Sequence, residues 1–296
     1  MHIWSLSRNF ELYSSARLVE AARQRGHEIV ELDTAHLTAL NTAAGPRLLL
    51  HGEELPPADC AVYRSGYTRL RFGWDLALWR QVESLGIVTI NSTAAVLRCS
   101  DKFYTHQLLT AAGIPTVDSV LVTELSQLNT AAKLVGGFPL VLKWSRGTRG
   151  VGTALIESSS ALRGQWQLSS ALEQNALLER FHPEAKGSDL RAVVVGGKLI
   201  AIYRRTAPAG DFRSNIHRGG GAELYSPSAA EIELVERTAR ALGLELCGVD
   251  LLPTAEGAKV LEVNSVPGFR GVERVTNVDV AGAVIRQLER LVEGRK

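Results

Sequence analysis

The chain contains 296 residues, of which 45% are hydrophobic and 22% are charged. These proportions are ordinary for a folded globular protein and exclude long disordered segments. The formal net charge of +2 is too small to indicate nucleic-acid binding by itself. The N-terminus has no basic segment followed by an apolar stretch, and no apolar run is long enough to span a bilayer. We therefore expect a cytoplasmic protein without a signal peptide.

The three cysteines, Cys60, Cys99 and Cys247, lie far apart in the sequence and lack the spacing of metal ligands. Their neighbours are apolar or small. The sequence therefore predicts buried thiols in a reducing compartment.

The first region, residues 1–95, alternates short apolar strands with helical patterns. We expect strands at His2–Leu6, Glu28–Leu32, Cys60–Arg64 and Ile87–Ile90, and helices at Ser14–Gln24 and Phe72–Leu85. This order, with glycine at helix ends, predicts a small parallel βαβ sheet. No G-x-G-x-x-G follows the first strand, so a dinucleotide-binding site is poorly supported.

The second region, residues 96–178, begins with a helical pattern over Ser100–Ala112 that ends at Gly113. A continuous apolar strand follows at Leu140–Trp144, and another strand is expected at Thr153–Glu157. Because a glycine-rich loop joins these two strands, the pair is typical of a flap.

The third region, residues 179–296, has the strongest local turn signal in the chain. Gly196-Gly197 separates two apolar strands and predicts a two-residue hairpin turn. The expected strands and helices are Leu190–Val195, Leu199–Arg204, the helix Ala229–Leu242, Leu246–Leu252, Lys259–Val263 and the helix Val280–Val292.

The most informative side chains for function are acidic and amide groups near the C-terminal end. Glu262 and Asn264 are two residues apart on a predicted strand, so both point to the same face of the sheet. Asp250 lies on the preceding strand, and the short connection Pro253–Gly257 favours an antiparallel hairpin. These groups supply the hard oxygen ligands that Mg²⁺ prefers. The alternative is a solvated edge strand, and the apolar neighbours count against it because buried sheets do not tolerate unpaired carboxylates.

Lys143 ends an apolar strand directly before Gly147, Gly150 and Gly152. Glycines let backbone amides approach phosphate oxygens, and a neighbouring Lys supplies a point charge, so the pattern predicts a flap over phosphates. It is not a P-loop, because no G-K-[ST] follows. Considered alone, the segment fits an ordinary glycine-rich hairpin tip better than a phosphate-binding flap.

Lys102 lies at the start of a predicted helix. Ser100 is the expected N-cap, and Asp101 suits the positive end of the helix dipole. A lysine at this end opposes the dipole, which indicates an anionic partner, although a solvated lysine is the simpler alternative.

A basic segment includes Tyr203-Arg204-Arg205 and continues through Gly210–Gly221. Four arginines, an Asn and a His in this stretch suit the binding of phosphate or carboxylate. The alternatives are an RNA-contacting loop or a solvated loop. Aromatic residues are sparse in the segment, so a nucleic-acid surface is less favoured.

Taken together, these motifs resemble the ATP-grasp superfamily and, within it, the RimK group of α-L-glutamate ligases. The residues that carry the resemblance are Leu6-Ser7-Arg8, Ser100-Asp101-Lys102, Lys143 with its glycine loop, Gly210-Asp211-Phe212-Arg213-Ser214-Asn215, Asp250, Glu262-Val263-Asn264-Ser265-Val266-Pro267-Gly268 and Gly271-Val272-Glu273. The resemblance covers essentially the whole chain. It implies an α/β (α+β) ATP-grasp fold with a Rossmann-like pre-ATP-grasp domain (1–95), a central lid (96–178) and a C-terminal ATP-grasp domain (179–296).

The resemblance also implies roles for individual residues. Lys102, Lys143, Gly147 and Gly150 are expected at the ATP phosphates, and Asp250, Glu262 and Asn264 at two Mg²⁺ ions, with Mn²⁺ as a substitute. Glu179, Arg180 and Phe181 are expected beside adenine, and Asp189 at the ribose. Phosphate and the activated carboxylate are assigned to Arg213, Ser214 and Asn215. The catalytic set is Arg204, Arg213 and Asn215, with Arg218 as a further carboxylate-binding candidate and Arg64 as a contact to the acceptor.

Two segments depart from the family pattern. Glu179-Arg180-Phe181 stands where Gln-Glu-aromatic is common, and Val266 is bulkier than the usual small residue. We expect nucleotide binding to survive the first change, because adenine contacts in this segment are largely made by the backbone.

The implied reaction is the ATP-dependent joining of a carboxylate to an amine through an acylphosphate, with the α-amino group of glutamate as the expected amine. The expected partners are ATP, L-glutamate or another amino acid, and a carboxylate acceptor. The acceptor could be a protein C-terminus (a ribosomal protein included), a poly-glutamate chain, a cofactor tail or an amino-group carrier of lysine-type biosynthesis. No membrane partner is expected, and a homo-oligomer is implied by the family. The alternative from another class is a nucleotide-dependent RNA- or ribosome-binding module without turnover.

Overall fold

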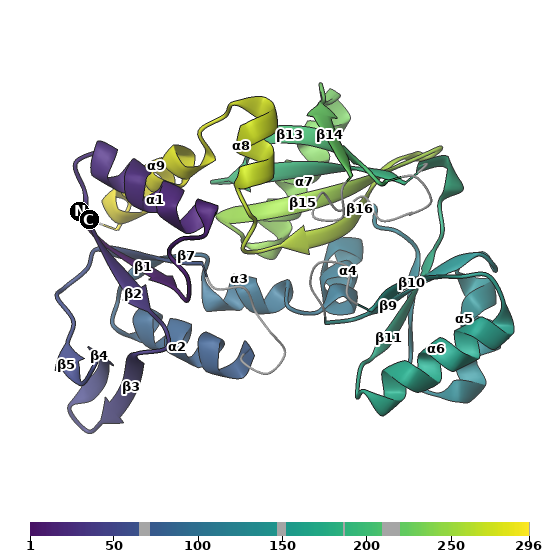
Figure 1. Ribbon diagram of the computed structural model, residues 1–296, viewed down its shortest axis with the longest axis horizontal. Helices are drawn as coiled ribbons and strands as arrows, with labels where there is room; N and C mark the ends of the chain where they lie inside the picture. The colour runs from purple at the N-terminus through teal and green to yellow at the C-terminus, as the bar shows by residue number, and fades with distance from the viewer. Residues whose placement is uncertain (65–71, 147–151, 186, 209–219, 296) are drawn as a thin grey trace.

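The computed structural model describes residues 1–64, 72–146, 152–185, 187–208 and 220–295. These residues form three larger β-sheets and one small sheet (Figure 1). In this part of the chain, no helix has both the length and the apolar character needed to cross a membrane.

The N-terminal sheet is parallel, as predicted, with the strand order β2-β1-β6-β7. Its strands are β1 (His2–Ser7), β2 (Glu28–Asp33), β6 (Cys60–Tyr63) and β7 (Val88–Ile90), and its helices are α1 (Tyr13–Gln24) and α2 (Phe72–Ser84). The order reverses between β1 and β6, so the carboxyl ends of these two strands form the topological switch point.

A small antiparallel sheet is inserted between β2 and β6, and the sequence patterns did not predict it. It contains β3 (Leu37–Thr42), β4 (Gly45–Leu50) and β5 (Glu53–Glu54). Most side chains of β3 are exposed, so the strand has no continuous apolar face that a period-2 pattern would reveal.

The central sheet is antiparallel, with the order β10-β9-β11-β8. Its elements are β8 (Ser119–Val122), α5 (Leu128–Leu134), β9 (Leu140–Trp144), β10 (Thr153–Ile156), α6 (Ser159–Ala171) and β11 (Ala176–Arg180), with a short 3₁₀ turn at Leu125–Gln127. The predicted strands β9 and β10 pair with each other, with Lys143 opposite Thr153. Helices α5 and α6 lie together at the outer side of this sheet (Figure 1).

Two short helices connect the N-terminal and central sheets: α3 (Thr93–Arg98) and α4 (Lys102–Ala111). Asp101, rather than the expected Ser100, is the N-cap of α4, and its side chain accepts hydrogen bonds from the amides of Phe103 and Tyr104. The Ser100 hydroxyl instead donates to the carbonyl of Leu97 at the end of α3.

The C-terminal sheet is antiparallel, with the order β14-β13-β12-β15-β16. Its elements are a 3₁₀ turn at Pro183–Ala185, β12 (Ser188–Val195), β13 (Lys198–Thr206), β14 (Gly221–Leu224), α7 (Ala229–Leu242), β15 (Leu246–Thr254), β16 (Gly257–Asn264), α8 (Arg270–Thr276) and α9 (Val280–Glu293). The predicted hairpin is present between β12 and β13, and Gly196 and Gly197 both adopt positive φ, as the turn requires.

The apolar core connects the N-terminal and C-terminal sheets. Helices α1 and α9 lie against each other, and one hydrophobic cluster includes residues of both helices and of both sheets. The opposite face of the C-terminal sheet packs against α4 and α7 in a second cluster, and the central sheet has a separate core with α5 and α6.

Polar contacts reinforce the packing of α1 against α9. The Arg25 guanidinium forms two hydrogen bonds to Glu289, and Nε2 of His27 lies 2.7 Å from the same carboxylate. Arg25, followed by His27, holds the pKa of Glu289 below its usual range.

Two of the three thiols are buried, as predicted, and Cys99 is partly buried; none of them forms a disulfide. Burial raises the pKa of both Cys60 and Cys99 to about 12. These thiols therefore stay protonated at neutral pH, which makes them poor nucleophiles.

Candidate active site

One face of the C-terminal sheet changes from apolar to charged along its strands. On β12, Val193 lies in the core between the sheets, whereas Asp189 and Arg191 on the same face do not. The strand register places Arg191 opposite Asp250 and Asp250 opposite Glu262. Three adjacent strands therefore present charged groups side by side at one end of the sheet.

Two arginines hold the Asp250 carboxylate. Arg191 binds it with Nε and Nη2, the latter 2.6 Å from Oδ2, and Nη2 of Arg205 lies 2.9 Å from the same oxygen. Arg205 also binds both carboxylate oxygens of Asp189, at 2.6 and 2.5 Å. Burial alone would raise the pKa of Asp250, but Arg191 and Arg205 outweigh it and lower this pKa. Asp250 is therefore ionised at neutral pH.

The structure separates Arg204 from this cluster. Arg204 precedes Arg205 on β13, so its side chain points to the opposite face of the sheet. There its guanidinium lies 4.9 Å from the ring centroid of Tyr225 and 3.2 Å from a carboxylate oxygen of Glu223. The charged face thus includes Arg205 and Arg191, and the arginine that we expected to be catalytic lies elsewhere.

The strand β16 carries the other two metal-ligand candidates. Glu262 is partly exposed, and its Oε1 lies 3.4 Å from Nζ of Lys102. Asn264 is exposed, and its Oδ1 accepts a hydrogen bond from the Val266 amide at 2.9 Å. Among the described residues, no group of three or more His, Cys, Asp or Glu side chains is arranged to hold a metal. The candidate donor set is therefore two carboxylates and one amide.

Gly248 keeps space open beside this donor set. It is paired with Asn264, so it lies two residues from Asp250 along β15 and on the same face as the Asp250–Glu262 pair. A Cβ at this position would lie 3.2 Å from Cβ of Pro267 and 3.3 Å from Nη1 of Arg191. A side chain here would press on the guanidinium that holds Asp250.

Lys143 and Glu179 form a buried ion pair between β9 and β11, with 2.6 Å between Nζ and Oε2. Burial alone would lower the pKa of Lys143, but Glu179, and then Glu262 and Asp250, raise it. Oε1 of Glu179 is buried and has no hydrogen-bond partner among the described residues. A buried acceptor without a donor costs about 1–3 kcal/mol, so this oxygen marks a place where a ligand N–H fits.

Helix α4 brings Lys102 to the edge of the same site. Its backbone amide donates to the Ser145 carbonyl, 2.9 Å away, so the first turn of α4 is attached to the chain just after β9. The two lysines, from α4 and β9, thus lie near the acidic face of the C-terminal sheet.

The loop after Asn264 is held by the carboxyl-terminal edge of the N-terminal sheet. Nδ2 of Asn91 donates to the Ser265 carbonyl at 2.8 Å, and Nη2 of Arg64 donates to the Pro267 carbonyl at 2.7 Å. Arg64, expected at the acceptor, therefore contacts the loop that follows the metal-ligand candidates. This loop lies at the edge of a parallel sheet where ligands of α/β proteins usually bind.

The other residues predicted for the site lie on the surface, are half-buried, or fall outside the described part of the chain. Arg180 is exposed and lies 3.5 Å from Asp118, and Phe181 is half-buried next to it. Six candidates lie outside the described residues: Gly147, Gly150, Arg213, Ser214, Asn215 and Arg218.

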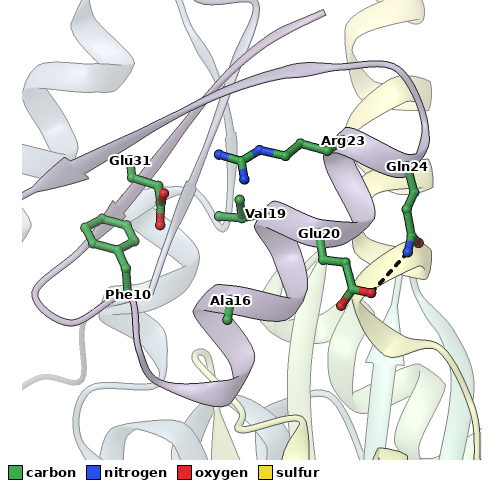
Figure 2. Close-up of a pocket in the computed structure, with 7 residues that line it drawn as sticks. All are labelled: Phe10, Ala16, Val19, Glu20, Arg23, Gln24 and Glu31. Atoms are coloured by element: carbon green, nitrogen blue, oxygen red, sulfur yellow. Dashed lines mark hydrogen bonds between the residues drawn. The ribbon is translucent and has the colours of Figure 1, made fainter.

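A surface hollow of about 430 Å³ lies between α1 and β2 (Figure 2). Glu20 and Gln24 of α1 form a hydrogen bond at its rim, and Phe10 and Glu31 border it on the other side. No predicted site residue lines this hollow, so it adds nothing to the candidate site.

Comparison with known proteins identifies the family. Residues 1–96 match the RimK PreATP-grasp domain model, and residues 99–288 match the RimK-like ATP-grasp domain model. A protein from Stenotrophomonas maltophilia named "Probable alpha-L-glutamate ligase" is 42% identical over 291 residues, covering 98% of this chain and 99% of its own.

Solved structures show the same fold. A RimK domain ATP-grasp protein from Sphaerobacter thermophilus superposes with a TM-score of 0.75 at 25% identity, covering 98% of this chain and all of its own. The ATP-grasp ligase PsnB, solved with a precursor variant, Mg and ADP, gives a TM-score of 0.74 at 22% identity over 97% of this chain and 98% of its own.

The fold and the charged site define an ATP-grasp ligase, an enzyme that forms carbon–nitrogen bonds with ATP. This chain belongs to the RimK-like ATP-grasp family, which confirms the fold class and the family expected from the motifs.

No role was assigned from the sequence to Arg191 or Arg205, the two arginines that contact Asp250. A signal for both was available, because side chains alternate along a strand. Asp189 and Arg191 share one face of β12. Arg204 and Arg205 are consecutive on β13, so only one of them can lie on the face that carries the acidic groups of the neighbouring strands. Which of the two does so depends on the strand register, and this follows only from the pairing of β12 with β13 and β15.

Proposed function

We propose that this chain joins the α-amino group of L-glutamate, or of another amino acid, to the carboxylate of an acceptor. The observation that carries the proposal is the placement of Asp250 opposite Glu262, with Lys102 and Lys143 beside them. Two carboxylates and two lysines at one place suit a nucleoside triphosphate with its metal. The name of the 42% identical relative supports glutamate as the amino acid.

The residues present fit ATP and Mg²⁺. Asp250, Glu262 and Asn264 would hold two Mg²⁺ ions, or Mn²⁺ in their place, because all three offer hard oxygen donors on one sheet face. The unpartnered, buried Oε1 of Glu179 would accept a hydrogen bond from the amino group of adenine. The bound metal would supply neutralisation of the negative charge on the phosphate oxygens.

In the proposed reaction, a carboxylate oxygen of one substrate attacks the γ-phosphorus and ADP departs. Lys102 and Lys143 would place positive charge against the phosphate oxygens, where phosphoryl transfer needs it most. The substrate amine then attacks the acyl carbon, inorganic phosphate leaves, and an amide remains. The glycine-rich segment after Lys143 would exclude water, which otherwise hydrolyses the acylphosphate.

The two arginines that bind Asp250 have a separate role in the proposed reaction. Arg191 and Arg205 keep its carboxylate ionised and fix its orientation before any ligand arrives. Preorganisation of this kind lowers the cost of assembling the site during turnover.

Release of ADP by the purified chain tests the proposal. The protein is incubated with Mg²⁺-ATP, L-glutamate and one candidate acceptor at a time: peptides that end like ribosomal proteins, poly-glutamate, and carboxylate-bearing carriers. We expect ADP release only when both the acceptor and the amino acid are present, and a product heavier by one or more glutamate residues. Binding of RNA with a steep salt dependence and no turnover would instead support a nucleic-acid-binding module.

A further inference from the structure

His106 lies behind the candidate metal site without being part of it. It is one turn after Lys102 on α4, so both side chains point to the same side of the helix, toward β16. Lys102 reaches Glu262, and Nε2 of His106 lies 3.3 Å from the carbonyl oxygen of Leu261, the residue directly before it. The ring is 3% exposed.

The two neighbours of the ring determine its tautomer. A carbonyl oxygen only accepts hydrogen bonds, so Nε2 carries the proton and donates to Leu261. Nδ1 then accepts from the hydroxyl of Ser119 on β8, at 3.1 Å. Burial lowers the pKa of His106, which favours this neutral form at pH 7. Both ring nitrogens are therefore satisfied in one orientation.

Leu261 is the extra residue of a β-bulge. The register passes from Asp250–Glu262 to Leu251–Val260, which leaves Leu261 with no partner on β15. A bulge bends its strand and changes the direction of nearby side chains. Leu261 directly precedes Glu262, so the position of the Leu261 carbonyl group influences where the Glu262 carboxylate points.

We propose that His106 is a positioning residue that fixes the bulge at Leu261 and thereby aims Glu262 into the metal site. The inference rests on the proposed function, because it takes Glu262 to be a metal ligand. Contacts that orient a metal-ligating residue without touching the metal typically contribute about 10- to 100-fold to metal affinity or activity.

Three substitutions at His106 separate this role from simple packing. In His106→Gln, the side-chain amide nitrogen occupies the place of Nε2, so the donor to Leu261 is kept. In His106→Asn, the shorter side chain reaches only the place of Nδ1, and in His106→Met both hydrogen bonds are lost. Ser119→Ala is the matched control, because it removes the bond at the other ring nitrogen and leaves the donor to Leu261.

The readout is direct binding of Mn²⁺ to the full chain, measured by electron paramagnetic resonance with a non-hydrolysable ATP analogue present. We expect His106→Asn and His106→Met to weaken Mn²⁺ binding by at least about 10-fold, with His106→Gln and Ser119→Ala within about 3-fold of the original chain. Melting temperatures show whether each variant is folded.

Equal Mn²⁺ affinity in all variants would overturn the proposal. Equal losses in the Gln and Asn variants would also overturn it, because the donor to Leu261, kept only in the Gln variant, would then make no difference. The assay also separates this inference from the function on which it rests. If the unsubstituted chain binds no Mn²⁺ with the nucleotide, the proposed function fails. If it binds and the His106 variants do not differ, only the role of His106 is refuted.

Discussion

Replacing Glu262 with Gln removes one of the two negative charges of the proposed metal site while it preserves the shape of the side chain. The Glu262 side chain is 39% exposed and lies 3.4 Å from Lys102. An ion pair with this exposure contributes at most about 1 kcal/mol to the free energy of unfolding. Loss of a metal ligand costs several kcal/mol in the transition state. Because about 1.4 kcal/mol corresponds to a tenfold change in rate, turnover should fall by at least about 100-fold.

The matched control is Glu256→Gln, on the turn of the same hairpin. Glu256 is also paired with a lysine, Lys259 at 2.7 Å, but it is 65% exposed and outside the site. ADP release measures turnover, and thermal melting measures stability. We expect the Glu262 variant to melt within about 4 °C of the original chain and the Glu256 variant to keep full activity. Normal turnover of the Glu262 variant would remove this residue from the metal site, and a large drop in its melting temperature would contradict the stability argument.

Four further substitutions test other parts of the structure. Lys143→Met leaves the Glu179 carboxylate buried and unpaired, so we expect a loss of about 3–5 kcal/mol in denaturant unfolding, most of it recovered when Glu179→Leu is added. Gly248→Ala places a methyl group 3.2 Å from a proline carbon and should destabilise by about 1–3 kcal/mol. Gly164→Ala, where the methyl group meets nothing within 4 Å in a helix, should instead stabilise by about 0.5–1 kcal/mol. Glu289→Gln should lower the melting temperature at pH 7. Its folded-state pKa is depressed, so this stabilisation is present above the unfolded pKa and is lost as the pH falls through the folded value. Melting temperatures of the two chains should therefore approach each other as the pH falls below the ordinary Glu pKa of about 4.3, and a constant difference down to pH 3 would refute the assignment.

The elements that sequence patterns predicted well have a strong apolar face or a clear end signal. Helix α7 begins with a Ser228–Glu231 capping box and ends at Gly243 in the left-handed conformation, and both features are visible in the sequence. Helix α6 was missed because its buried residues are only Leu162 and Ser169. A helix that buries so little apolar surface leaves a weak periodic pattern.

Local patterns were enough to place Glu262 and Asn264 on one face, to locate a lysine at the end of the strand before a glycine-rich segment, and to indicate which family these motifs resemble. Such features depend on residues close together in the chain, where strand alternation fixes their geometry. The folded chain was needed to show that Arg205 rather than Arg204 contacts Asp250, and that His106 contacts the bulge before Glu262. The Arg191–Asp250 contact spans 59 positions and the His106–Leu261 contact spans 155. Contacts of this kind follow from strand register and helix packing, which the whole hydrophobic core sets together, so no local pattern encodes them.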